Sequence, residues 1–429
     1  MLLRLIFSDL KKNHNDWTGL FLVAFFCGLA SGWAIFLISS TENAVASMSS
    51  QLRNSGSATL ALVWLAAFPI SSSVSRLVEE GKEGTYSLWR LIGVRRWQIG
   101  VSFLIQIAVS SGLGLILGIL LFWIFAFALL SSQGALLNID GVATITALLF
   151  GLSAFVVGGV KSARLSLRAS PIEAIRGHSR RQRRKFGFIP FLISFASLTC
   201  LLICFVVAYG SEDGVMVSCM VVVPLLVAII FSQVARWVFS LFLNFWLKLS
   251  KGPLWTIAVR GALYRSAGSD AIQLPIMLGV ALVSGLLSVS DVLLAYLANR
   301  GVQGNGVTIA QLLSFLGAPL LICMAGGVAV VIMASASRRA DEKGLLACGV
   351  SRAQSAQIII YEALAHSASA VSAGLLCAFL SFLIASCLCS VAIVPWSLVA
   401  SSLCIFAISF FTVVASMLSS SAVARALSV

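Results

Sequence analysis

Charged side chains are scarce in this chain of 429 residues, since only 10% are Asp, Glu, Lys or Arg while 59% are hydrophobic. An ordinary soluble domain carries about 25% charged residues. The mean hydropathy is +1.03, and apolar residues fill most of the length instead of forming one patch. Such a chain needs a lipid bilayer to cover its apolar surface, which excludes a soluble enzyme.

Motifs for catalysis and ligand binding are also missing. The three histidines, His14, His178 and His366, are scattered and form no triad or metal set, and the ten cysteines lie in or beside apolar runs without spaced ligands. No Gly-x-x-x-x-Gly-Lys-Ser/Thr loop occurs, and GKEGT at 81–85 lacks the upstream glycine and the strand of such a loop. We therefore expect no metal, no cofactor and no enzymatic activity on this chain.

Long polar segments are the third absence. About 20 apolar residues cross a bilayer, and ten runs of that length or more leave only short connections between them. These runs lie near 17–40, 57–78, 99–131, 142–163, 187–210, 214–235, 271–297, 308–336, 355–390 and 395–420. The sequence therefore predicts an all-α polytopic membrane protein with about ten transmembrane helices.

The basic residues predict the orientation of these helices. Lys and Arg number 29 against 15 Asp and Glu, and positive loops stay in the cytoplasm. With residue 1 inside, the outward loops hold only Arg53 and Arg300, so both termini are expected to be cytoplasmic. The basic run at 176–185 is then explained by topology and by anionic lipid, and we expect no nucleic-acid partner.

An internal repeat organises the chain. LWRLIGVRRWQIG from Leu88 aligns with GLLACGVSRAQSA from Gly344 at an offset of 256 residues. Amphipathic segments precede the first run, at 2–13, and the seventh, at 254–268. The sequence predicts two parallel units, 1–178 and 251–429, each an interfacial helix plus four spans, joined by a two-span linker at 179–250.

Two patterns recur at this offset. The first is Gly-Val-x-Arg-x-Gln, at 93–98 and 349–354, in a short polar helix between the second and third spans of each unit. It predicts a helix end at the glycine, a turn and a cation beyond it, and we favour partner docking over an ordinary loop held inside by its charge. The second is a pair of small residues, Gly114 and Gly118 over Ala370 and Gly374, which allows close helix approach. We expect it at a contact between units or at a gate, with generic packing as the alternative.

Two acidic residues, Asp291 and Glu362, lie near the ends of apolar runs. An ionisable side chain there can mark a transport pathway. Glu362 has Gln106 as its counterpart in the first unit. A single charge at a helix end is more often interfacial, and we interpret both residues in that way.

The turn pattern resembles the coupling region of the FtsX/MacB-like (type VII) ABC transporter permeases, in which an acidic residue precedes Gly-x-Leu-Arg-Ala-Leu-Gly-Ala-Ser. SPIEAIR at 170–176 resembles the Pro-x-x-x-Leu-Arg sequence that closes the four-span unit of this family, while the second unit ends without that proline. The chain resembles in particular the fused ten-span permeases of peptide-antibiotic resistance systems. The loops at 41–56 and 298–307 are too short for the large external domain that many members carry. Matching residues are Glu83, Leu88, Arg90, Leu91, Gly93, Arg96 and Gln98, then Glu342, Leu345, Gly349, Arg352 and Gln354.

This resemblance implies a permease subunit in a bacterial plasma membrane that exports or extracts an amphipathic substrate, such as an antimicrobial peptide or a lipid. ATP and Mg would bind two copies of a separate ABC ATPase subunit, and a sensor kinase is a further implied partner. A sensory scaffold remains an alternative, as does a secondary transporter, which needs ion-coupling charges within its spans. The implied ATPase-coupling residues are Glu83, Arg90, Gly93, Arg96, Gln98, Glu342, Gly349, Arg352 and Gln354.

The predicted topology can be tested by cysteine labelling in intact cells, on a chain freed of its own cysteines. A cysteine placed at residue 300 should react with a membrane-impermeant reagent, and cysteines at 180–184 should react only after the membrane is opened. Labelling of residues 180–184 from outside, or protection of residue 300, would contradict ten spans with both ends inside.

Overall fold

The computed structural model describes Asp9 and residues 14–40, 46–131, 141–167, 188–210, 213–249, 252–264, 266–300, 309–391 and 393–426. Every regular element in that part is a helix, and none of its residues is in a strand. The helices are α2 (His14–Ser39), α3 (Ala46–Leu91), α4 (Arg96–Ser131), α5 (Gly141–Ser166), α7 (Phe188–Gly210), α8 (Asp213–Leu249), α9 (Pro253–Tyr264), α10 (Ser266–Asn299), α11 (Ile309–Ala347), α12 (Arg352–Cys389) and α13 (Trp396–Ala426).

Each of the ten predicted apolar runs coincides with one long helix. Eight helices contain a described segment that is long and apolar enough to cross a membrane: α2, α3, α4, α5, α8, α10, α12 and α13. The other two, α7 and α11, contain shorter apolar stretches at 194–207 and 317–330. The structure is therefore an all-α protein of polytopic membrane type, and the number of crossings beyond eight stays a prediction.

The short polar helices expected between the second and third spans are not separate elements. Helix α3 continues without interruption from its apolar part to Leu91, and α11 continues in the same way to Ala347. The charged stretch after the apolar part contains no proline, and Arg76 pairs with Glu80 one turn later, at 3.1 Å between Nε and Oε1. Its Glu, Lys and Arg residues have helix propensities similar to those of apolar residues, so the span projects beyond its hydrophobic segment.

The contacts divide the chain into two compact units. Residues 1–182 form the first unit together with the middle of α11, 313–334. The second unit consists of 183–312 and 335–429. Helices α7 and α8 of the predicted linker thus group with the second unit, where α8 packs on α10 and α12.

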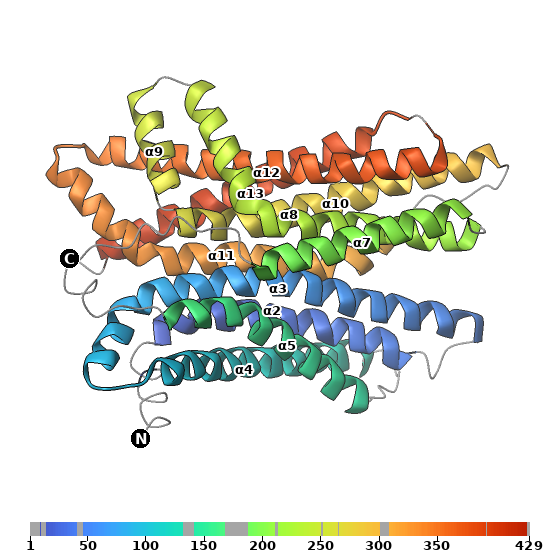
Figure 1. Ribbon diagram of the computed structural model, residues 1–429, viewed down its shortest axis with the longest axis horizontal. Helices are drawn as coiled ribbons and strands as arrows, with labels where there is room; N and C mark the ends of the chain where they lie inside the picture. Colours follow the sequence, from blue (N-terminus) through green and yellow to red (C-terminus); the bar gives the residue numbers. More distant parts are fainter. Residues whose placement is uncertain are drawn as a thin grey trace. The chain divides into compact units, whose positions relative to one another are not determined.

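The first, third and fourth helices of the predicted four-span arrangement pack on one another in both units. In the first, α2 lies against α3 and α4, and α5 lies against α3 and α4 (Figure 1). In the second, α12 lies against α10 and α13, and α10 also contacts α13. The amphipathic segment predicted at 254–268 is the helix α9, whose Ala258, Val259 and Ala262 are buried where it packs on α12 and α8. The earlier segment at 2–13 lies outside the described residues, apart from Asp9.

Glycines allow α2 and α4 to approach closely. A Cβ added at Gly118 would lie 2.1 Å from the carbonyl oxygen of Phe25, and one added at Gly114 would lie 2.6 Å from that of Phe21. From the opposite side, a Cβ at Gly28 would lie 2.4 Å from the carbonyl oxygen of Leu115. These are contacts with backbone atoms, so no side chain can move aside to make room.

The second unit uses its small pair between α12 and α10. A Cβ at Gly374 would lie 2.6 Å from the Cβ of Val280, and Ala370 is fully buried. The expectation that these residues make a contact between units is therefore corrected. Each small pair packs against the first span of its own unit, because the third span must come close enough to that helix for backbone contact.

Gly118→Ala tests the α2–α4 contact, with Gly112→Ala as a matched control in the same helix. The nearest atom to a Cβ at Gly112 is the Cδ1 of Leu152 at 4.0 Å, so both substitutions gain the same helix propensity but only the first meets backbone. We expect Gly118→Ala to lower the free energy of unfolding by about 1–3 kcal/mol and Gly112→Ala to leave it unchanged or raise it. Thermal unfolding in detergent measures both, and equal midpoints would contradict the close contact.

Candidate functional site

The two predicted turn segments, residues 88–98 and 344–354, have the same helix boundaries in the structure. Helix α3 ends at Leu91 and α4 begins at Arg96, while α11 ends at Ala347 and α12 begins at Arg352. Both boundaries are 256 residues apart, which is the offset of the sequence repeat. The turn segments are thus two versions of one structure.

A glycine with positive φ ends each first helix. Gly93 has φ +97° and Gly349 has φ +88°, a conformation in which a Cβ would be strained. In the first turn the N–H of Val94 donates to the carbonyl of Trp89 at 3.0 Å, and the N–H of Gly93 donates to that of Arg90 at 3.1 Å. Two equivalent bonds close the second turn, so both are Schellman motifs.

A glutamine side chain caps the start of each following helix. The Oε1 of Gln98 accepts the N–H of Arg95 at 2.9 Å, and the Oε1 of Gln354 accepts the N–H of Ser351 at 3.0 Å. In the second turn the Oγ of Ser351 also accepts the N–H of Gln354 at 3.2 Å, which completes a capping box. An N-cap side chain of this kind contributes about 0.5–2 kcal/mol. The geometry of the turn therefore explains why the same spacing of glycine and glutamine occurs twice in the chain.

The arginine of the pattern has no such explanation. Arg96 and Arg352 are the first residues of α4 and α12, and both are exposed. The N-terminus of a helix carries partial positive charge, so a cation there is unfavourable by about 0.3–1 kcal/mol. In both turns the arginine destabilises the helix that it begins. Its presence at both positions therefore indicates a role outside that helix.

Three other residues of the predicted coupling set, Arg90, Glu83 and Glu342, lie in α3 and α11 before the turns. Arg90 is half-buried near the end of α3. Glu83 lies in α3 and Glu342 in α11, but the positions of their side chains lie outside what the structure describes. The structure brings the turn residues together within each unit, and the role of the two acids stays a prediction.

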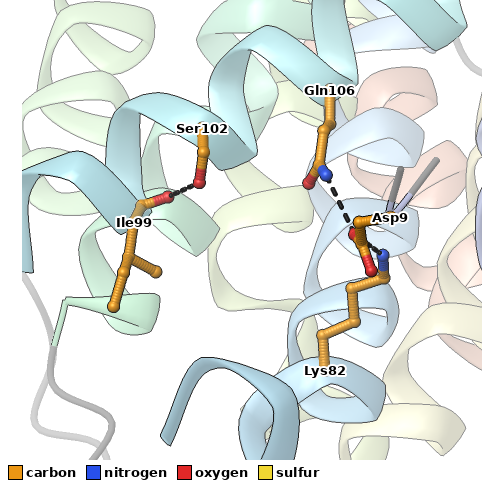
Figure 2. A network of polar contacts seen from close by, with 5 residues as sticks. All are labelled: Asp9, Lys82, Ile99, Ser102 and Gln106. Atoms are coloured by element: carbon orange, nitrogen blue, oxygen red, sulfur yellow. Dashed lines mark hydrogen bonds and ion pairs between the residues drawn. The ribbon is translucent and has the colours of Figure 1, made fainter. Parts of the chain in front are cut away.

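A buried ion pair joins Lys82 of α3 to Asp9 in the first unit (Figure 2). The Nζ of Lys82, which is 1% exposed, lies 2.5 Å from the Oδ2 of Asp9. The Nε2 of Gln106, from α4, donates to the same oxygen at 2.9 Å. The carboxylate of Asp9 thus joins the segment before α2 to both helices that lead to the first turn.

Aromatic rings connect this ion pair to the turn. Lys82 lies over the ring of Trp17, 4.8 Å from its centroid, and the ring of Trp17 is 5.9 Å from that of Phe103. The ring centroids of Phe103 and Tyr86 are 6.3 Å apart, and those of Tyr86 and Trp89 are 5.6 Å apart. Burial, together with nearby carboxylates, raises the pKa of Tyr86 well above its usual range, so its phenol stays neutral. Packed rings at these distances hold the end of α3 against α4.

The second unit has different polar residues at the corresponding positions. Gln273, Glu362 and His366 lie 256 residues after Trp17, Gln106 and Ser110. The Nε2 of Gln273 lies 3.0 Å from the Nδ1 of His366, and the Nε2 of His366 lies 3.5 Å from the Oε1 of Glu362. With its proton on Nε2, His366 accepts the amide N–H of Gln273 at Nδ1 and turns its protonated nitrogen toward the Glu362 carboxylate.

The interpretation of Glu362 as an interfacial charge is therefore wrong, since Glu362 is only 5% exposed and pairs with His366. The spacing of four residues between them was a signal that could have revealed this pair on one helix face. Asp291 is half-buried and accepts a hydrogen bond from the hydroxyl of Ser397. Its contact joins α10 to α13, and no sequence pattern indicated it.

Among the residues that the structure describes, no three or more His, Cys, Asp or Glu side chains lie together in a way that could hold a metal ion. No protein-family model matches the chain, and no curated protein has a similar sequence. The case for function therefore rests on the turn segments and on the residues that anchor them.

Lys82→Met tests the buried ion pair, because it leaves the Asp9 carboxylate buried without its cation. Loss of one partner of such a pair costs about 3–5 kcal/mol. The surface pair Arg76–Glu80 provides the control, and Arg76→Met should cost about 0.5 kcal/mol. Thermal unfolding measures both, and adding Asp9→Asn to Lys82→Met should restore part of the loss. Equal effects of the two single variants would show that the pair is not a stabilising anchor.

Proposed function

We propose that this chain is the membrane-spanning permease subunit of an ABC transporter of the FtsX/MacB-like type, with two parallel four-helix units. The observation that carries the proposal is the duplicated turn with an exposed arginine, Arg96 or Arg352, at the start of a helix that it does not stabilise. Two turns with the same backbone and the same exposed arginine suit a partner that is itself present twice. A dimer of ABC ATPase subunits is such a partner, and it would hold the ATP and Mg.

The anchoring below the turns supports this proposal. A force applied to the first turn passes through Tyr86 and Phe103 to α2 and α4, and Lys82 ties α3 to the segment before α2. Closure of an ATPase dimer against the cytoplasmic turns would then move whole helices, because packed cores transmit displacement. The motion would drive export or extraction of a substrate.

An amphipathic substrate, such as an antimicrobial peptide or a lipid, fits the interior best. A hydrated solute would lose several kcal/mol for each polar group left unpaired within the spans. The acidic side chains described in α10 and α12 are Asp270, Asp291 and Glu362, and all three are engaged by side chains of the protein. We therefore propose that the substrate enters laterally from the membrane.

A proton-coupled secondary transporter is the second candidate, and the buried pair Glu362–His366 is the observation that favours it. We rank it lower because it gives no reason for two matched turns outside the apolar segments. A sensory scaffold that signals to a kinase would use the same turns, and only transport measurements separate it from the permease.

The experiment is charge reversal at both turns, Arg96→Glu with Arg352→Glu, in proteoliposomes that contain an ABC-type ATPase subunit from the same genome. We expect at least a tenfold loss of peptide- or lipid-stimulated ATPase activity with little change in thermal stability, since glutamate at a helix N-terminus favours the helix. Arg300→Glu is the control, because Arg300 is exposed but distant in the predicted topology. Unchanged coupling in the double variant, or stimulation by sugars or inorganic ions instead of amphipathic molecules, would contradict the proposal.

A further inference from the structure

The two turn segments share a backbone but present different side chains. In the first, four large apolar residues are exposed: Leu88 at 59%, Leu91 at 58%, Ile92 at 77% and Trp97 at 59%. The corresponding positions of the second turn hold only small residues, Gly344, Ala347, Cys348 and Ala353. Leu346, at 38%, is the large apolar residue exposed in the second turn, so that turn offers less apolar surface to a partner than the first does.

The basic residues differ in the same sense. The first turn has three arginines, Arg90, Arg95 and Arg96, whereas the second has only Arg352. At the N-cap position the second turn has Ser351, whose hydroxyl completes the capping box. The first turn has Arg95 there, which is exposed and supplies no side-chain acceptor. Compared with the second turn, the first turn thus lacks the hydroxyl that stabilises the helix start and has an additional exposed cation.

The supports below the turns differ as well. The rings of Phe103, Tyr86 and Trp89 hold the first turn. Residues 256 positions later are Ile359, Glu342 and Leu345, so the second turn cannot have this aromatic support. A rigid support lowers the entropy lost when a partner binds, which favours the first turn as a binding site.

We propose that the two turns bind their ATPase subunits unequally, with the first turn as the main docking site and the second as a weaker contact. The proposal rests on the permease function proposed above. Its occupant is one ABC-type ATPase subunit whose docking surface combines an apolar pocket with an acidic rim. Exposed tryptophan and arginine are the residues that most often dominate binding energy in protein interfaces.

The repeat argues against a membrane surface as the occupant of the first turn. Both turns follow the same helices at the same register, so in parallel units they lie at the same predicted depth. If Leu91, Ile92 and Trp97 served only to hold a turn at the lipid headgroups, the second turn would need similar residues. It has Ala347, Cys348 and Ala353 instead, so the apolar side chains are specific to the first turn and not to its depth.

The test exchanges sequence between the turns in the full-length chain. Arg95→Ser with Trp97→Ala converts the first turn to Val-Ser-Arg-Ala-Gln, the sequence of the second at 350–354, and adds the capping hydroxyl. Ser351→Arg with Ala353→Trp makes the reverse exchange. Titration of an ABC-type ATPase subunit from the same genome onto nanodisc-embedded protein measures the affinity. We expect the first exchange to weaken binding about tenfold or more, and the second to leave binding unchanged or strengthen it.

The outcomes separate this inference from the function on which it rests. If the unmodified chain does not bind the ATPase, both are overturned. If it binds and the first exchange leaves the affinity unchanged, or if the second exchange weakens binding as much as the first, the permease function stands and the inequality is wrong. An effect of the first exchange that occurs only in nanodiscs with anionic lipid would assign the turn to the membrane surface and would also overturn the inference.

Discussion

Backbone hydrogen bonding is the constraint on which this structure depends. In a bilayer each N–H and C=O needs a partner within the protein, because water is absent, and the long helices of the described part meet that need within single segments. Beyond the apolar segments, where the chain leaves one helix and enters the next, the helix ends still leave backbone groups without a partner in their own helix. At the turns after α3 and α11, glycine in the left-handed conformation and a glutamine side chain satisfy the exposed backbone groups in four residues. These turns are compact and well defined for this reason.

Close helix contacts then decide the form of each unit. Hydrophobic burial contributes little between helices that are surrounded by lipid, so association depends on packing and on polar contacts. Glycines let α2 and α4 touch through their backbones, and Gly374 does the same for α12 and α10. The buried polar contacts differ between units. In the first, Asp9 contacts Lys82 of α3 and Gln106 of α4. In the second, His366 of α12 contacts Gln273 of α10 and Glu362 of its own helix. The repeat has thus kept its backbone contacts while its buried polar residues have changed.

The turns show a similar division between backbone and side chains. Glycine, valine and glutamine build the same turn twice, and an arginine at the first helical position is kept in both. The surrounding residues differ in size, charge and support. A duplicated structure with unequal surfaces is expected when both copies meet related partners but only one copy supplies most of the binding.

The sequence alone determined the helical class, the position of each long helix and the turns, because these features depend on neighbours along the chain. A run of apolar residues, a glycine after a helix and a glutamine three residues into the next act within a few residues of themselves. The change from apolar to charged residues within α3 does not mark a helix end, because Glu, Lys and Arg form helices as readily as apolar residues do. The continuation of α3 to Leu91 therefore differs from the separate polar helix that this change predicted.

Only the tertiary structure decided which helix faces meet. The contact of Gly118 with α2, and the pairing of Lys82 with Asp9 over 73 residues, depend on how separate helices rotate and approach. Glu362 and His366 lie on one helix, yet their burial comes from the helices that cover them. Helix formation is local and leaves a periodic record in the sequence, whereas the packing of one helix on another depends on the shape of both surfaces and leaves none.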